Sequence, residues 1–258
     1  MSKSKYLIGI DLGTTNSTMS YAKIGEDEAS SLPEISLFPI PQMVRSGSQE
    51  ERKTMPSSLY YPLKEELEAG SFAVDWASDR EFCVGSAASE RGGELPSRLV
   101  TSAKSWLCHS GIDRRSSLLP YTAGEDDPRT SPLAVTAELL RHLREVWNLR
   151  FPDAPFVDQS LLITVPASFD PSARQLTQEA ALLAGYPEEV VLMEEPQAAF
   201  YAWLYHNPDE WRTHLAVGDR LLVVDIGGGT TDFTLINVEE EGGDLSLTRM
   251  AVGSHLLL

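Results

Sequence analysis

Two segments that lie far apart in the chain share one arrangement of residues. The first spans Ile10 to Asn16 and the second spans Val224 to Asp232. In each, an apolar stretch carries one aspartate two residues before the first glycine of a turn, and two threonines follow the glycines. An ordinary β-hairpin would explain a single copy equally well. Two copies with the same spacing favour a shared function.

These residue types are suited to binding phosphate next to a metal ion. Glycines allow successive backbone N–H groups to converge on an anion, and threonine hydroxyls add donors. A carboxylate beside a phosphate requires a hard cation between the two anions. The pattern therefore predicts two facing hairpins that clamp a phosphate chain, with Mg²⁺ held by Asp11, Asp225 and Asp232, partly through water.

Two other phosphate-binding motifs are excluded. The chain contains no Gly-Lys dipeptide and therefore no P-loop. A dinucleotide-binding fingerprint that began at Gly227 would need its third glycine where Asp232 stands.

Composition limits the classes of partner. Of the 258 residues, 38 are acidic and 21 are Lys or Arg, which gives a net charge of −17. Nucleic acids and anionic membranes are bound by clustered basic residues, so we expect neither as a partner. No apolar run approaches the roughly 20 residues of a spanning helix, and the apolar start is too short for a signal peptide. Cys83 and Cys108 make neither a disulfide framework nor a metal site. We expect a soluble, cytoplasmic protein.

Hydrophobic patterns predict the elements that position the two segments. Ser131 and Asp170 each precede a proline, as N-cap residues often do. The strand–helix–strand order after residue 159 implies parallel pairing in a covered sheet. The last three strands, joined by tight turns, indicate an antiparallel meander. The fold class is therefore α/β. The expected strands are 6–12, 17–24, 160–165, 190–193, 221–226, 232–238 and 245–252, and the expected helices are 132–149, 170–185 and 196–205.

Four motifs follow one another at suitable spacing. They are Asp11-Leu12-Gly13-Thr14-Thr15-Asn16-Ser17, Val165-Pro166-Ala167-Ser168-Phe169, Glu194-Glu195-Pro196-Gln197-Ala198-Ala199 and Asp225-Ile226-Gly227-Gly228-Gly229-Thr230-Thr231-Asp232. In this order they resemble the nucleotide-binding domain of the seventy-kilodalton heat-shock chaperones (the DnaK type). Each motif alone is shared with actin and sugar kinases, whereas the ordered set is specific. The resemblance implies an actin-like ATPase fold with a ribonuclease H-like core.

The resemblance also implies roles for individual residues. Lys104 would place positive charge on the transferred phosphoryl group, and Glu195 would lie near the metal and the attacking water. Asp11 and Asp232 would complete this catalytic set. Mg²⁺ and its water would be organised by Asp11, Asp225 and Asp232. The phosphates of ATP or ADP would be held by Gly13, Thr14, Thr15, Gly227, Gly228, Gly229 and Thr230.

Three further residues carry weaker expectations. Pro166 and Arg174 match positions that the family uses to relay the nucleotide state outward, and a strand-end proline and a surface arginine explain them nearly as well. His255 is expected to be a structural residue at a β-edge.

The resemblance implies a division of the chain into lobes. Residues 1–43 and 131–214 would form the core of a first lobe, and residues 44–130 would form a subdomain inserted into it. Residues 215–258 would begin a second lobe that is truncated. An incomplete lobe would expose an apolar face and an unpaired strand edge, so self-association is expected there.

The expected function is that of the N-terminal part of a molecular-chaperone ATPase. It would bind Mg-ATP between two lobes and hydrolyse it to drive peptide binding in an absent C-terminal domain. Partners would be nucleotide, unfolded peptide clients, and co-chaperones or exchange factors, and the segment alone would be weakly active or inactive. Two alternatives stay open. One is a small-molecule kinase of the same superfold, acting on a sugar or acid. The other is a non-catalytic, nucleotide-gated scaffold.

Overall fold

The first expected hairpin lies at the centre of a six-stranded sheet. In the computed structural model, β1 (Tyr6–Leu12) pairs antiparallel with β2 (Asn16–Lys23). On its other side β1 pairs in parallel with β10 (Ser160–Val165), which pairs in parallel with β11 (Val191–Glu194). The expected parallel pairing is therefore confirmed. Next to β2 lie β3 (Ile35–Leu37) and β6 (Met55–Pro56). The structure describes residues 4–25, 32–77, 79–109, 111–208, 210–242, 244–253 and 256–257.

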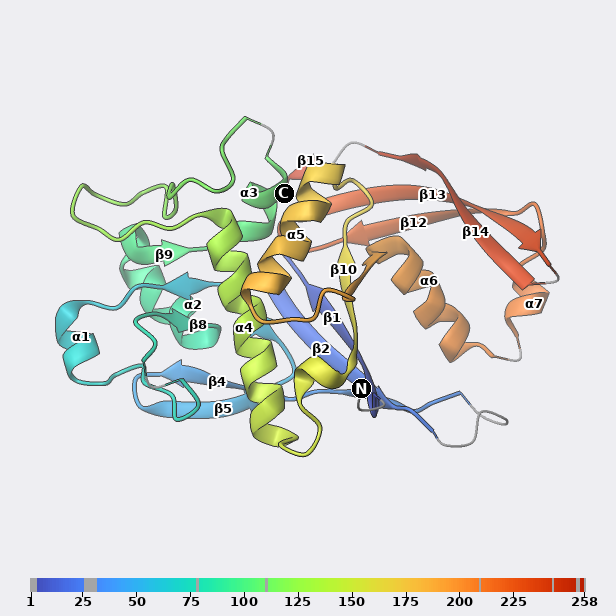
Figure 1. The fold of residues 1–258 in the computed structure, drawn as a ribbon. Helices are drawn as coiled ribbons and strands as arrows, with labels where there is room; N and C mark the ends of the chain where they lie inside the picture. The colour runs from blue at the N-terminus through green and yellow to red at the C-terminus, as the bar shows by residue number, and fades with distance from the viewer. Residues whose placement is uncertain are drawn as a thin grey trace.

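Two helices, α4 (Pro132–Arg150) and α5 (Pro171–Leu183), cover one face of this sheet (Figure 1). Both begin where the sequence predicts. The Ser131 side chain accepts a hydrogen bond from the backbone N–H of Ala134 at 3.0 Å, and Asp170 accepts one from Ala173 at 2.6 Å. The covered face of the sheet and the inner faces of both helices belong to one buried apolar cluster. Because alternate residues of a strand face opposite sides, Asp11 lies on the other face.

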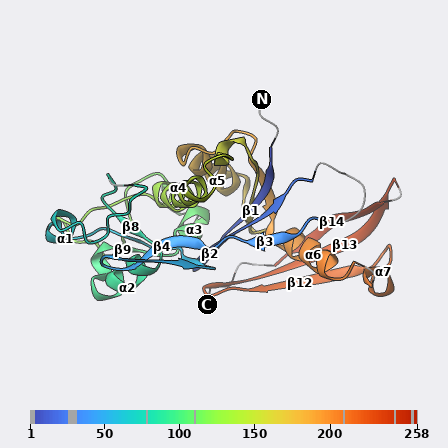
Figure 2. The ribbon, with the colours of Figure 1, turned by 90° about the horizontal axis from the view of Figure 1, so that it is seen from below.

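A second, four-stranded sheet carries the second aspartate-glycine segment. Its strands are β12 (Arg220–Ile226), β13 (Thr230–Glu241), β14 (Asp244–Val252) and β15 (Leu256–Leu257), and all of its pairings are antiparallel. The expected meander is thus confirmed. Helix α6 (Glu195–His206) follows β11 and packs against β12, and α7 (Trp211–His214) precedes β12. Figure 2 shows α6 lying along the four-stranded sheet. His255 lies outside the described residues.

Short elements fill the region between β3 and α4. They are β4 (Ile40–Arg45), β5 (Ser48–Arg52), β7 (Leu59–Tyr60), α1 (Lys64–Glu68), β8 (Cys83–Val84), α2 (Ser86–Glu94), β9 (Leu99–Val100) and α3 (Ala103–Cys108). The longest has nine residues, too few for a hydrophobic period to stand out. The expected boundary of an inserted subdomain at residue 44 falls inside β4 and stays a prediction. In the described ranges no helix is both long and apolar enough to cross a membrane.

Candidate functional site

The two glycine turns meet each other. A Cβ added to Gly228 would lie 2.7 Å from Thr15 Oγ1, and one added to Gly229 would lie 3.4 Å from the Thr14 methyl group. Gly13 is equally constrained, because its Cβ would lie 2.2 Å from the carbonyl oxygen of Asn16. Larger residues would therefore push the turns apart or distort the first turn. The closeness of the two turns confirms the expectation that the two hairpins face each other.

Ser57 supports the first turn from outside. Its hydroxyl donates a hydrogen bond to the Gly13 carbonyl at 2.7 Å, and its backbone N–H donates to the Thr15 carbonyl at 2.8 Å. The Ser17 hydroxyl lies 2.9 Å from that of Ser57, and both side chains are buried. Ser57 directly follows β6 and lies at this position because β6 pairs with the start of β2. The first turn is therefore fixed by contacts on both sides of its chain.

The three aspartates lie around the turns. Asp225 stands directly opposite Asp232 in the antiparallel pair of β12 and β13. Asp11 stands beside Thr164 in the parallel pair of β1 and β10, and the Thr164 hydroxyl donates a hydrogen bond to Asp11 Oδ1 at 3.1 Å. The Asp232 side chain is buried. Thr164 is a site residue that the sequence did not reveal, because nothing in its local pattern marks a threonine at a strand end.

Lys104 and Glu195 form an ion pair at the same place. Lys104 lies in the first turn of α3, Glu195 in the first turn of α6, and the ammonium donates a hydrogen bond to Glu195 Oε1. The side chains are 11% and 14% exposed, respectively. An ammonium has three donors, so Lys104 retains hydrogen-bonding capacity for a further acceptor. The two residues are far apart in the sequence, and only the fold brings them together.

The site carries an excess of negative charge. Loss of hydration is the main reason that the pKa of Glu195 is raised, and Asp11 and Asp225 raise it further, whereas Lys104 lowers it. The pKa of Asp225 is raised chiefly by loss of hydration, with smaller contributions from Asp232 and Asp11. The carboxylates of Asp11, Asp225, Asp232 and Glu195 therefore lie near one another, and Lys104 offsets the charge of Glu195 and Asp225. A bound cation would relieve their mutual repulsion.

A cavity of about 510 Å³ opens between these groups. Small residues of α6 (Ala198, Ala199 and Ala202) leave room along one wall, and Pro166 lies at the end of β10 on another. The expected site residues that line the cavity are Asp11, Gly13, Thr14, Thr15, Lys104, Glu195, Asp225, Gly227, Gly228 and Thr230. Gly229 lies next to Thr14, and Asp232 lies opposite Asp225. The fold therefore gathers every residue that the sequence proposed for the site.

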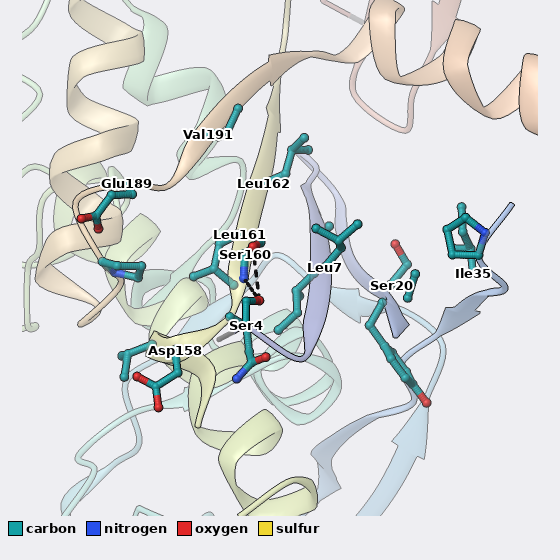
Figure 3. Close-up of a pocket in the computed structure, with 18 residues that line it drawn as sticks. Ser4, Leu7, Ser20, Ile35, Asp158, Ser160, Leu161, Leu162, Glu189 and Val191 are labelled. Carbon is teal, nitrogen blue, oxygen red and sulfur yellow. Dashed lines mark hydrogen bonds between the residues drawn. The ribbon is translucent and has the colours of Figure 1, made fainter. Parts of the chain in front are cut away.

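A larger cavity, of about 840 Å³, does not suit phosphate. It lies on the face of the six-stranded sheet opposite α4 and α5, where Leu7, Leu162 and Val191 project into it (Figure 3). Its walls are largely aliphatic and include the carboxylates Asp158 and Glu189. No lysine or arginine lines it among the described residues. An anionic ligand would find no charge partner there.

The residues of the smaller cavity fit a phosphate and a hydrated cation. The glycine turns leave backbone N–H groups free of shielding Cβ atoms, and the aspartates supply the hard oxygen ligands that Mg²⁺ requires. Within the described ranges, no three His, Cys, Asp or Glu side chains stand close enough to ligate one ion together. A cation held by the three aspartates would therefore keep waters between itself and some of them, as Mg²⁺ often does.

The expected relay residues have defined contacts. Pro166 lines the cavity. Arg174 on α5 is not part of the cavity, and its guanidinium contacts Glu194 Oε1 at 2.5 Å. Glu194 precedes the ion-paired Glu195 and stands at the N-cap of α6. The sequence did not single out Glu194, because neighbouring glutamates at a helix start are common features of solvent-exposed helices.

Comparisons with known proteins identify the family. The family model described as Hsp70 protein matches residues 48–256. The chain is 32% identical over 259 residues to a chaperone protein HscA homolog from Methylibium petroleiphilum. It is 30% identical over 248 residues to a chaperone protein HscA homolog from Haemophilus influenzae. Each alignment covers 93% of this chain and 35% of the relative, so the chain spans about a third of their length. The match confirms the expected actin-like α/β fold, and the chain belongs to the Hsp70 family.

Proposed function

We propose that this chain binds the phosphates of ATP or ADP, together with Mg²⁺, between its two glycine turns. The observation that carries this proposal is the meeting of Gly228 with Thr15 above a cavity lined by aspartates and one lysine. Two β-hairpins with unrelated roles would have no reason to approach so closely while leaving such a cavity. The membership of the chain in the Hsp70 family supports the same conclusion.

Both turns would contribute hydrogen-bond donors to the phosphates. The Gly227 N–H donates to the Thr230 carbonyl within the second turn at 2.8 Å. The backbone N–H groups of Gly228 and Gly229 and the hydroxyls of Thr14, Thr15 and Thr230 can donate hydrogen bonds into the cavity. Asp11, Asp225 and Asp232 would hold the hydrated Mg²⁺. When bound, Mg²⁺ would neutralise phosphate charge that these carboxylates would otherwise repel.

Lys104 and Glu195 are the residues that we assign to hydrolysis. The Lys104 ammonium can keep its contact with Glu195 and still donate to a phosphoryl oxygen, which would stabilise negative charge in the transition state. Glu195 has a raised pKa and can accept a hydrogen bond from an attacking water. Catalysis would rest mainly on position and charge.

The wider activity would belong to a longer protein. The relatives are named chaperones, and the chain spans about a third of their length. We infer that nucleotide turnover in this segment would drive peptide binding in a separate C-terminal domain. Unfolded peptides, co-chaperones and exchange factors would then be partners of that longer protein.

Calorimetric titration of the 258-residue chain with ADP, in Mg²⁺ and in excess chelator, tests the binding proposal. We expect weak binding that requires Mg²⁺ and is lost in Asp225→Asn. Asp153→Asn is the matched control, because this exposed aspartate lies outside the cavity. Absence of ADP binding to the unaltered chain, or equal binding by Asp225→Asn, would overturn the proposal.

A phosphate-release assay separates hydrolysis from the two alternatives. We expect slow release to water that added sugars and carboxylic acids leave unchanged. Phosphorylation of an added acceptor would instead favour a small-molecule kinase. Binding without any phosphate release, in the unaltered chain and in Lys104→Ala alike, would favour a scaffold.

A further inference from the structure

Arg249 joins the two sheets beside the cavity. It lies on β14 of the four-stranded sheet, and its guanidinium contacts Glu194 Oε1 at the end of β11 in the six-stranded sheet. The same Nη1 donates a hydrogen bond to the Ala167 carbonyl at 3.3 Å. Arg249 thus connects β14 to β11 with one ion pair, and to the turn after β10 with one hydrogen bond.

Both anchor points adjoin residues of the cavity. Glu194 precedes Glu195, and Ala167 follows Pro166. On the other side, Arg249 stands opposite Ile236 in β13, the strand that begins at Thr230 beside the second glycine turn. Arg249 is therefore linked through β13 to the second turn. Through Glu194 and Ala167 it is also linked to the wall of the cavity that belongs to the six-stranded sheet.

We propose that Arg249 is a positioning residue that sets how closely the second glycine turn approaches the first. Its consequence for nucleotide rests on the proposed function, whereas its effect on the two sheets does not. The turns approach to within van der Waals distance at Gly228 and Thr15, so a small rotation of one sheet would open the gap. Arg249 and Glu194 resist this rotation.

The charge balance makes the proposal testable without unfolding the protein. Arg174 and Arg249 share the same oxygen of Glu194, and the Glu194 side chain is largely buried. Removing either arginine leaves the carboxylate paired with the other, so no buried charge is stranded. The two arginines differ in one respect: α5 and β11 both belong to the part of the molecule built on the six-stranded sheet, whereas β14 does not.

The primary experiment measures the distance between the sheets without nucleotide. Spin labels on Leu182→Cys and Val217→Cys, both exposed positions, report this distance after Cys83 and Cys108 are replaced by alanine. We expect Arg249→Gln to broaden the distance distribution toward longer values and Arg249→Lys to restore it in part. Arg174→Gln should leave it unchanged. So should Arg220→Gln, a control on β12 that forms no ion pair among the described residues.

Titration with Mg-ADP supplies the second readout. We expect Arg249→Gln to weaken binding about two- to fivefold, as the loss of a partly exposed ion pair would. A distance distribution in Arg249→Gln identical to that of the unaltered chain would overturn the proposal. An equal broadening in Arg174→Gln would also overturn it. The distance between the sheets would then depend on an arginine that does not link them. If the chain bound no nucleotide, the distance measurement would still decide the role of Arg249.

Discussion

Thr15 and Gly228 meet at a distance that leaves no room for a side chain at position 228. A Cβ there would lie 2.7 Å from Thr15 Oγ1 and 3.1 Å from Thr15 Cβ. The two residues come from different sheets, each at the tip of a hairpin. Their contact fixes the separation of the two turns and thereby the width of the cavity between them.

Gly228→Ala is therefore expected to weaken Mg-ADP binding by about tenfold, because overpacking of this kind costs on the order of 1–3 kcal/mol. Gly93→Ala is the matched control. A Cβ on Gly93, in α2, would meet no atom within 4 Å, and alanine is favoured in helices. Calorimetric titration of both variants measures the effect. Equal affinities would show that the turns can separate without consequence.

The Lys104–Glu195 ion pair is expected to matter for stability as well as for turnover. Lys104→Met strands a largely buried carboxylate, which costs about 3–5 kcal/mol in comparable pairs. In Lys104→Met/Glu195→Gln no charge is stranded, so we expect most of the stability to return while phosphate release stays absent. Urea unfolding of the single and double variants measures this. A single variant as stable as the unaltered chain would contradict the prediction.

The same variant has a predictable pH dependence. Burial raises the pKa of Glu195, and removing Lys104 removes the group that lowers it. In Lys104→Met, Glu195 therefore binds a proton in the folded state at pH values above the usual glutamate pKa. In the unfolded state it has lost its proton at the same pH. Stability of Lys104→Met, relative to the double variant, should therefore rise as the pH falls from 7 toward 5. A constant difference across this range would count against it.

The glycine turns could be predicted because the residues that define them are adjacent in the sequence. Asp11 with Gly13, and Asp225 with Gly227, show the same spacing in both copies, and phosphate binding needs those residue types. The strand β1 is buried on one face, and its hydrophobic pattern could be recognised in the sequence. The strand β12 could be predicted from its run of apolar residues, although none of its residues is buried. Lys104 carries no such local signal. Only its resemblance to a family motif pointed to it.

Other site residues act through contacts that only the fold creates. Ser57 directly follows the two-residue strand β6, and its hydroxyl reaches the first turn because β6 pairs with β2 there. Arg249 and Glu194 are charged residues on separate strands, and single charged residues on strands are common on any protein surface. The short elements between β3 and α4 escaped prediction for a related reason. Their pairing partners, rather than their own sequences, define them.

Thr164 is expected to hold Asp11 in position. Thr164→Val keeps the shape of the side chain but removes the donor to Asp11 Oδ1. Loss of one such hydrogen bond is worth about 0.5–1.5 kcal/mol, so Mg²⁺-dependent ADP binding should weaken about two- to tenfold. Thr164→Ser keeps the hydroxyl and should recover most of the affinity. Titrations at several Mg²⁺ concentrations measure this, and equal loss in both variants would refute the role of the hydroxyl.

His142 is expected to make folding sensitive to acid. Burial, with a smaller contribution from the nearby Arg80, lowers its pKa to about 3. Arg80 Nη1 lies 3.1 Å from Nδ1, and a guanidinium can only donate, so Nδ1 accepts and Nε2 donates to the Pro41 carbonyl at 2.9 Å. The folded state therefore excludes a proton that the unfolded state binds below about pH 6.5.

Stability attributable to His142 should therefore be complete above pH 6.5 and fall as the pH decreases. Between pH 7 and pH 5 the loss should approach about 2 kcal/mol relative to His142→Gln, which has no such titration. His206→Gln, which removes an exposed histidine, provides the control variant. Urea unfolding at several pH values gives the measurement. A pH-independent difference for His142→Gln would disprove the prediction.

The outer face of β12 is expected to drive self-association. Leu222 and Ile226 are 62% and 72% exposed and point to the same side of the strand, because they are separated by an even number of residues. Within the described chain β12 pairs only with β13, so its other edge presents backbone donors and acceptors as well.

Sedimentation velocity should show a weight-average mass that rises with concentration. Leu222→Lys/Ile226→Lys should suppress this rise, because two charges on an apolar face oppose its burial. Leu182→Lys, an exposed leucine on α5, should not suppress it. A monomer at every concentration would show that the exposed strand does not serve as a contact surface.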